Sequence, residues 1–295
     1  MMDLYDKTSH DINKIITLNY STSFSLGVKL LPKEYRQAIF SIYGFVRLAD
    51  EIVDTFHQHD KEKLLTTFRH DTYESIKEGI STNPVLNGFQ LVVNKYKIDL
   101  ELIDKFLASM EMDLKNTQHT KDSFQKYVYG SAEAVGLMCL KVFYPNEKSQ
   151  YESLKYYARK LGEAFQKVNF IRDIADDYED KGRTYFPSID FTSLTLSQKN
   201  EIELEIEQNF SEAYHGILLL KKDIRLAVFL IYKYYMKLFK KIKKNKPEVL
   251  MKKRVRINNF FKIIILFEVY LRNLFLKSPG KLISLNQKQK VMSSY

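Results

Sequence analysis

The 295-residue sequence has few of the residues that break a chain into short strands, and almost none of the residue that forms disulfides. Ten glycines and six prolines leave few turn signals, so long helices are favoured. The single cysteine, Cys139, excludes an intramolecular disulfide framework and is typical of a reducing compartment. The N-terminus has acidic residues and no apolar signal segment, so we expect a cytoplasmic protein.

A long hydrophobic run is also missing. The most apolar stretch, FFKIIILFEVYL, is interrupted by Lys262 and Glu268 and is shorter than the roughly 20 apolar residues that span a membrane. Tryptophan is absent as well. In contrast, 20 tyrosines and 20 phenylalanines supply a large apolar surface for a core or for the lining of a pocket.

Apolar residues recur with the helical period along most of the chain, which predicts an all-α protein. No linker or repeat divides it, so we expect one domain over residues 1–277 and a polar tail over 278–295. The longest irregular stretch, DKGRTYFPSIDFTSL, is a candidate flap over a site. Helices are predicted over residues 8–19, 33–54, 60–80, 84–96, 100–114, 122–143, 149–178, 196–219, 221–244 and 248–276.

Positive charge is concentrated towards the C-terminus. Between Lys221 and Lys262, fifteen lysines and arginines accompany two acidic residues, whereas the whole chain has a net charge of +10. Such a block can bind nucleic acid, an anionic membrane or a polyanionic substrate, or it can be a solvated helix face. No nucleic-acid-binding module accompanies it, so we expect no nucleic-acid partner.

One predicted helix carries a polar stripe on an otherwise apolar segment. Its members are 4, 3 and 4 residues apart and therefore share one helix face: Tyr43, Arg47, Asp50 and Asp54. A helix that is apolar nearly all round is normally buried, and buried charges need partners. The stripe is explained either by an internal ion pair of Arg47 with an aspartate or by a bound ligand.

A second stripe has members 3, 4 and 4 residues apart: Gln166, Asn169, Asp173 and Asp177. Asp173 and Asp177 repel each other unless a cation lies between them. Oxygen ligands without histidine or cysteine favour a hard cation such as Mg²⁺, which also binds substrate phosphates. Two such faces across a cavity would hold Mg²⁺ and a diphosphate, and nearby arginines suit bidentate phosphate binding: Arg47, Arg172 and Arg183.

Five segments carry a family resemblance: YSTSF (20–24), LLPKEYRQAIFSIYGFVRLADEIVD (30–54), MEMDL (110–114), YVYGSAEAVG (127–136) and QKVNFIRDIADDYEDKGRTYFP (166–187). In this order they resemble the blocks of the squalene/phytoene synthase family, and most of all those of bacterial phytoene synthases. The last segment is highly specific, and the resemblance extends from about residue 12 to 275. It implies a single-domain, all-α isoprenoid-synthase bundle around a central cavity.

The resemblance also implies the roles of individual residues. Asp50 and Asp54 would form one metal-binding face, and Asn169, Asp173 and Asp177 the other, with two or three Mg²⁺ ions between them. The catalytic residues would be Asp50, Asp54, Asp173, Asp177 and Tyr129. The substrate-binding residues would be Tyr20, Ser21, Ser23, Tyr43, Arg47, Gln166, Arg172, Arg183, Tyr235 and Arg254. Asp176 lies beside the second face, Tyr20 replaces a frequent histidine, and Arg256 replaces a more usual aromatic residue.

Family members join two prenyl diphosphates head to head. We expect two geranylgeranyl diphosphates to give phytoene through a cyclopropylcarbinyl diphosphate, in carotenoid biosynthesis. The alternative is two farnesyl diphosphates giving dehydrosqualene, or squalene if NADPH supplies a hydride. A non-catalytic assembly protein of the same fold is a remote alternative, which the intact aspartate sets argue against.

The expected partners follow from the same resemblance and from the basic block. Substrate and product are both lipids, so we expect the block to bind the inner face of a membrane peripherally. No obligate protein partner is implied.

Overall fold

A computed structural model describes residues 2–115, 118–187, 189, 194–258, 261–262 and 264–269. Within these residues the fold is all-α, and its one β-type contact is an isolated bridge between Gln118 and Thr184. The helices are α1 (Met2–Tyr20), α2 (Thr22–Leu30), α3 (Lys33–Asp54), α4 (Lys61–Glu78), α5 (Pro84–Tyr96), α6 (Leu100–Lys115), α7 (Lys121–Val128), the π-helix η1 (Tyr129–Glu133), α8 (Ala134–Phe143), α9 (Lys148–Lys181), α10 (Leu196–Leu219), α11 (Lys222–Lys243) and α12 (Pro247–Leu250).

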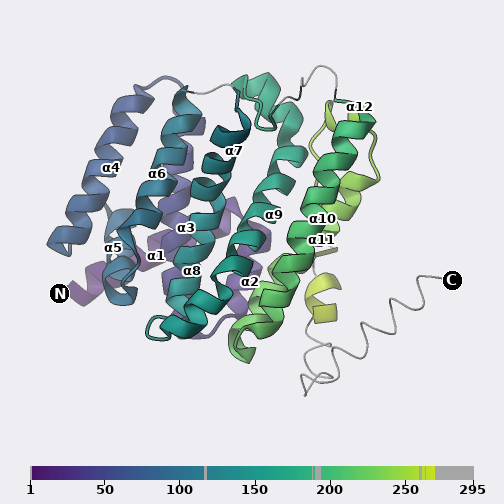
Figure 1. Cartoon of the computed structure of the whole chain (residues 1–295). Coiled ribbons are helices and arrows are strands. Elements are labelled where there is room, and N and C mark those ends of the chain that lie inside the picture. Colours follow the sequence, from purple (N-terminus) through teal and green to yellow (C-terminus); the bar gives the residue numbers. More distant parts are fainter. Residues whose placement is uncertain are drawn as a thin grey trace.

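Two helices, α3 and α9, carry the predicted polar stripes, and they pack in two groups of helices that share α8. Helix α3 packs against α1, α5 and α8, whereas α9 packs against α8, α10 and α11. The short helix α2 contacts both groups, since it packs on α1 and α3 and also on α11. In Figure 1, α1, α2 and α3 lie behind the row that contains α6, α7 and α9.

Most of the aromatic residues belong to the core. Phe45, on the back of α3, is fully buried and stacks on Phe89 of α5 with ring centroids 3.9 Å apart. Phe68 and Phe106 surround the same ring. A second cluster packs α9 against α7 and α10. These clusters fix the orientation of α3 and α9, and therefore of the polar faces that point away from them.

Close approach of α1 fixes the other side of α3. A Cβ atom at Gly44 would lie 1.8 Å from Oδ1 of Asn13, so only glycine fits next to Tyr43. Asn13 is fully buried, and its Nδ2 donates to the carbonyls of Ser9 and Val85. The contact holds α3 close to α1.

Several predicted boundaries are confirmed, and one predicted helix is wrong in part. Helices α3, α5 and α10 have the expected bounds, whereas α2 and the π-helical turn of η1 were not predicted. The helix expected over 248–276 is interrupted, because residues 251–258 are not helical, and helical residues resume at 261–262 and 264–269. Residues 270–276 and the tail expected over 278–295 lie outside the described residues.

The pattern of apolar and charged residues explains why residues 251–258 are not helical. Val255 is buried in the second core cluster and Ile257 packs against it, while Arg254 and Arg256 are exposed. Alternation of apolar and charged residues is the period of an extended chain, not of a helix. In the described residues, no helix is long and apolar enough to cross a membrane.

Replacing Phe45 tests whether the core behind α3 supports the fold. We expect Phe45→Ala to lower the free energy of unfolding by about 3–5 kcal/mol, because the cavity would lie inside a stacked aromatic cluster. Urea denaturation followed by circular dichroism measures the change. The matched control is Leu204→Ala, whose side chain is 65% exposed and whose loss should cost less than about 0.5 kcal/mol. Equal losses in the two variants would contradict the prediction.

Candidate active site

The first polar face runs along α3. The Arg47 guanidinium pairs with Glu51 and lies 4.3 Å from the centroid of the Tyr20 ring. Its Nε is buried and has no hydrogen-bond partner in the structure. A buried donor without an acceptor is costly, so this N–H is suited to an oxygen of a bound anion.

Tyr43 connects this face to the start of α2. Its ring stacks on Phe24 with centroids 5.1 Å apart, and its hydroxyl shares a hydrogen bond with Ser21. Burial raises the pKa of Tyr43 to about 12, although the charge of Arg47 opposes the rise. Tyr43 therefore stays protonated and can act as a hydrogen-bond donor.

The predicted serine pair lies at the N-terminal end of α2. The Ser21 hydroxyl caps the helix by accepting from the backbone N–H of Phe24. Between Ser21 and Ser23, Thr22 Oγ1 accepts a hydrogen bond from Lys262, whose pKa is lowered by burial. The sequence places Lys262 in the basic block and in an interrupted apolar run, and it gives no local signal for this contact with α2.

The second face runs along α9 and is supported by α11. The Tyr235 hydroxyl donates to Oδ1 of Asn169 over 3.3 Å, and Nδ2 of Asn169 donates to Gln166 over 3.4 Å. The Tyr235 ring stacks on Phe165 with centroids 3.9 Å apart. Tyr235 lies close enough to Tyr43 of α3 to contribute to the rise in the pKa of Tyr43, so the two faces approach each other here.

Two arginines hold Asp173. Nε of Arg172 lies 2.7 Å from Oδ1, and Nε of Arg254 also lies 2.7 Å from Oδ1. Arg254 reaches Asp176 as well, at 3.7 Å. Because Arg254 belongs to the extended stretch 251–258, the break in the predicted helix is what brings it to α9.

Arg183 joins the end of α9 to α3. Gly182, with a φ of 61°, turns the chain out of the helix, and the N–H of Arg183 donates to the carbonyl of Asp177 over 3.0 Å. A left-handed φ of this kind favours glycine. The Arg183 side chain then crosses to the first face, where Nη1 lies 2.7 Å from Oδ1 of Asp54.

A buried carboxylate, Asp113 of α6, completes this junction. It accepts hydrogen bonds from the hydroxyls of Tyr127 at 2.7 Å and Tyr185 at 3.2 Å, and lies 3.6 Å from Arg183. Burial raises its pKa to about 7, against the charge of Arg183. Sequence reasoning missed it, although it shares a helix face with buried Phe106 and Met110, where a carboxylate needs a partner.

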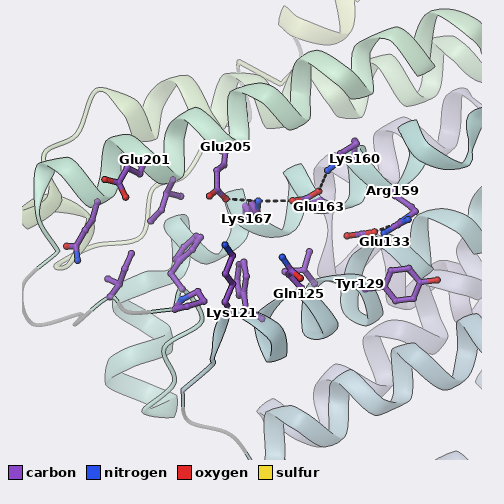
Figure 2. Close-up of a pocket in the computed structure, with 17 residues that line it drawn as sticks. Lys121, Gln125, Tyr129, Glu133, Arg159, Lys160, Glu163, Lys167, Glu201 and Glu205 are labelled. Carbon is purple, nitrogen blue, oxygen red and sulfur yellow. Dashed lines mark hydrogen bonds and ion pairs between the residues drawn. The ribbon is translucent and has the colours of Figure 1, made fainter.

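Tyr129, predicted to be catalytic, lies elsewhere. It stands in η1 at the rim of a cleft of about 630 Å³ between α7, α9 and α10 (Figure 2). Its ring lies 5.2 Å from the Arg159 guanidinium, which is paired with Glu133. Its described neighbours also include Glu101 and Tyr151, and none of them is an aspartate of either face. Its catalytic role remains a prediction.

Charges within this cleft are largely paired with one another. Lys167 is buried and binds Glu163 at 2.7 Å and Glu205 at 2.9 Å, and Lys160 also binds Glu163, as the dashed lines in Figure 2 show. The chain of ion pairs ties α9 to α10. We therefore regard it as a structural network.

The donors on the two faces fit a hard divalent cation. They are carboxylate and amide oxygens, with no thiol or imidazole among the predicted ligands: Asp50, Asp54, Asn169, Asp173 and Asp177. In the described residues, no three carboxylate, imidazole or thiol side chains converge on one point. Mg²⁺ typically takes one or two carboxylates and completes its shell with water and substrate phosphates, which suits this donor set.

The fold is that of the all-α isoprenoid synthases. It superposes on a dehydrosqualene synthase crystal structure with a TM-score of 0.76 and 21% identity, covering 90% of this chain and 98% of that one. It also superposes on a squalene synthase from Alicyclobacillus acidocaldarius with a TM-score of 0.69 and 18% identity, covering 82% and 95% of the two chains.

The chain belongs to the squalene/phytoene synthase family, because a sequence profile of that family matches residues 17–260. It is 28% identical to phytoene synthase of Arthrospira platensis over 268 residues, which cover 82% of this chain and 86% of that one. It is also 28% identical to 4,4'-diapophytoene synthase of Staphylococcus haemolyticus, over 64% and 65% of the two chains. The protein is thus a prenyltransferase of the squalene/phytoene type.

The protonation of His119 should make the stability of the protein depend on pH. Its ring faces Tyr185 and Tyr127, and burial together with the charge of Arg183 lowers its pKa below 6.5. The unfolded chain therefore binds a proton near pH 6.5 that the folded chain does not, so stability falls as the pH drops below 6.5.

We expect His119→Gln to remove part of this loss. The unfolding free energy of the wild type should fall relative to that of the variant between pH 7 and pH 5. Urea titrations at several pH values measure the difference. A difference that does not change with pH would contradict the expected neutral, buried imidazole.

Proposed function

We propose that the protein condenses two geranylgeranyl diphosphates to phytoene with Mg²⁺ as cofactor. The observation that supports the proposal is that Arg183 joins α9 to α3, since its backbone N–H binds the carbonyl of Asp177 and its side chain binds Asp54. This contact connects the helices of the predicted metal ligands, which are Asp50 and Asp54 on α3 and Asn169, Asp173 and Asp177 on α9. Four arginines accompany them: Arg47, Arg172, Arg183 and Arg254. Like charges on two helices need positive charge between them, which the arginines supply in part and Mg²⁺ would complete.

The residues divide the work of binding. Arg47 offers its unpaired Nε to a diphosphate oxygen, and Tyr43 with Ser21 adds hydroxyl donors at the end of α2. On the other side, Gln166, Asn169 and Tyr235 form a neutral hydrogen-bonded row. Charged donors would bind the diphosphates, while the neutral row orients them.

Two or three Mg²⁺ ions would stabilise the charge of the departing diphosphate. The allylic C–O bond of one substrate then ionises, and the double bond of the other attacks. Proton loss gives the cyclopropylcarbinyl diphosphate, and a second ionisation, rearrangement and proton loss give phytoene. Aromatic rings such as Phe165 and Tyr235 can stabilise a nearby cation and exclude water.

The second candidate uses two farnesyl diphosphates and makes dehydrosqualene, or squalene with NADPH. The fold match to a dehydrosqualene synthase and the similarity to a diapophytoene synthase favour it. The similarity to a phytoene synthase covers more of the chain, and we therefore rank phytoene first.

Product analysis tests the assignment. The purified protein is incubated with Mg²⁺ and either farnesyl or geranylgeranyl diphosphate, with and without NADPH, and the lipids are identified by mass spectrometry. We expect phytoene from the C20 substrate without NADPH. A C30 product formed in preference would overturn the proposed chain length, and no diphosphate release from either substrate would overturn catalysis.

The same assay tests the two faces. Asp50→Asn and Asp173→Asn should each lower Mg²⁺-dependent diphosphate release by about 100-fold or more, because each removes charge where the leaving group departs. Asp223→Asn is the control, since Asp223 is exposed at the start of α11. Normal turnover in either face variant would sink the two-face scheme.

We also propose that the basic block binds an anionic membrane on the cytoplasmic side. The C-terminal half of α11 and the stretch after it carry exposed lysines and arginines, including Lys237, Lys240, Lys244, Lys252 and Lys253. Phe261 and Ile264 beside them are 46% and 44% exposed. Basic and apolar side chains together suit the surface of an anionic bilayer.

Co-sedimentation with liposomes checks this. Binding should be stronger to vesicles with anionic lipid than to zwitterionic vesicles, and 0.5 M salt should weaken it because surface charges are screened. Lys240→Glu with Lys244→Glu should reduce it. Equal binding to both vesicle types would count decisively against the membrane role.

A further inference from the structure

We propose that Asp113 is a positioning residue for the reaction: it shares the Arg183 guanidinium with Asp54 and gives that arginine an alternative partner when Asp54 binds a divalent cation. This inference rests on the proposed function, because it assumes that Asp54 is a metal ligand. Asp113 itself is not one of the predicted ligands. It lies in the last turn of α6, with a side chain that is 5% exposed.

Arg183 lies between two carboxylates. Its Nη1 is 2.7 Å from Oδ1 of Asp54 and 3.6 Å from Oδ1 of Asp113, and Nη2 is 3.3 Å from the carbonyl of Val53. A shift of about 1 Å would exchange the nearer partner for the farther one, by simple geometry from these two distances. The Arg183 side chain is 10% exposed, so it cannot turn to water for compensation.

The charge balance explains why the second carboxylate matters. When a cation occupies Asp54, the guanidinium beside it loses its partner and is repelled. A buried charge left without a partner is strongly destabilising. Asp113 removes that cost, since the arginine moves towards a carboxylate that is already present. Without Asp113, binding of the cation at Asp54 would leave a buried guanidinium without a charged partner.

Aromatic and main-chain contacts fix the positions of Asp113 and Arg183. The Tyr185 ring stacks on Phe170 with centroids 4.2 Å apart, and its hydroxyl and that of Tyr127 orient the Asp113 carboxylate. The other titratable ring here is His119, whose lowered pKa keeps it neutral near pH 7, so it does not compete for Asp113. The backbone of Arg183 is bonded to Asp177 of the second face, so its side chain and backbone connect both metal faces.

The test compares two changes to the same carboxylate. Asp113→Asn removes the charge that faces Arg183 and keeps the shape. Tyr127→Phe is the matched control: it removes the 2.7 Å hydrogen bond to Asp113 but keeps the carboxyl group, and measurement well above pH 7 keeps that group charged although its pKa is raised to about 7. Both are measured by calorimetric titration of Mg²⁺ in the presence of inorganic diphosphate, and by hydrogen exchange of residues 182–187 in the metal-free protein.

We expect Asp113→Asn to weaken Mg²⁺ binding about 10-fold and Tyr127→Phe to change it less than about 2-fold. Asp113→Asn should also speed exchange of the Arg183 amide several-fold without metal. In an Arg183→Gln background, Asp113→Asn should have little further effect on Mg²⁺ binding, because the residue acts through the arginine. Thermal unfolding of each variant checks that it is folded.

Two results would overturn the inference. One is a loss of Mg²⁺ affinity in Tyr127→Phe as large as that in Asp113→Asn. The other is a 10-fold loss of Mg²⁺ affinity when Asp113→Asn is added to Arg183→Gln. If Asp113→Asn does not fold, Arg183→Gln and Tyr127→Phe still decide, since Arg183→Gln must change Mg²⁺ binding more than Tyr127→Phe. Because these measurements need no prenyl substrate, a wild type that binds Mg²⁺ and diphosphate but forms no product would refute the proposed reaction alone.

Discussion

Mutual repulsion of the carboxylates on α3 and α9 is the constraint on which the rest of this structure depends. Arginines neutralise it: Arg183 binds Asp54, and Arg172 and Arg254 bind Asp173. Guanidinium groups keep their charge when partly buried and bind carboxylate and phosphate alike. The same arginines that neutralise the aspartates are thus suited to bind a diphosphate.

The helix packing serves this arrangement. Phe45 packs into the core on the side of α3 opposite its polar stripe, and the close approach of Asn13 to Gly44 holds α3 against α1. Helix α9 is held by the cluster around Phe170 and by the ion pairs of Lys167. Burial of apolar surface is the large term in stability, and it supports two acidic faces that would not be stable by themselves.

The segment after α12 connects two proposed activities. Arg254 reaches the aspartates of α9, and its neighbours Lys252 and Lys253 are exposed beside the proposed membrane surface. If the basic block binds a bilayer, one stretch of chain contacts both the lipid surface and the aspartates of α9.

The sequence by itself determined most of the helices, the two stripes and the family, because helical periodicity and the spacing of Asp50 with Asp54 or Asp173 with Asp177 are local properties of the chain. It did not reveal α2, η1 or the break at residues 251–258. The tertiary structure alone decided the partners. Arg183 and Asp54 are 129 residues apart, and such a pair depends on how helices pack and not on any local period. Asp113 and Lys262 joined the site for the same reason, and Tyr129 came to lie beside Arg159.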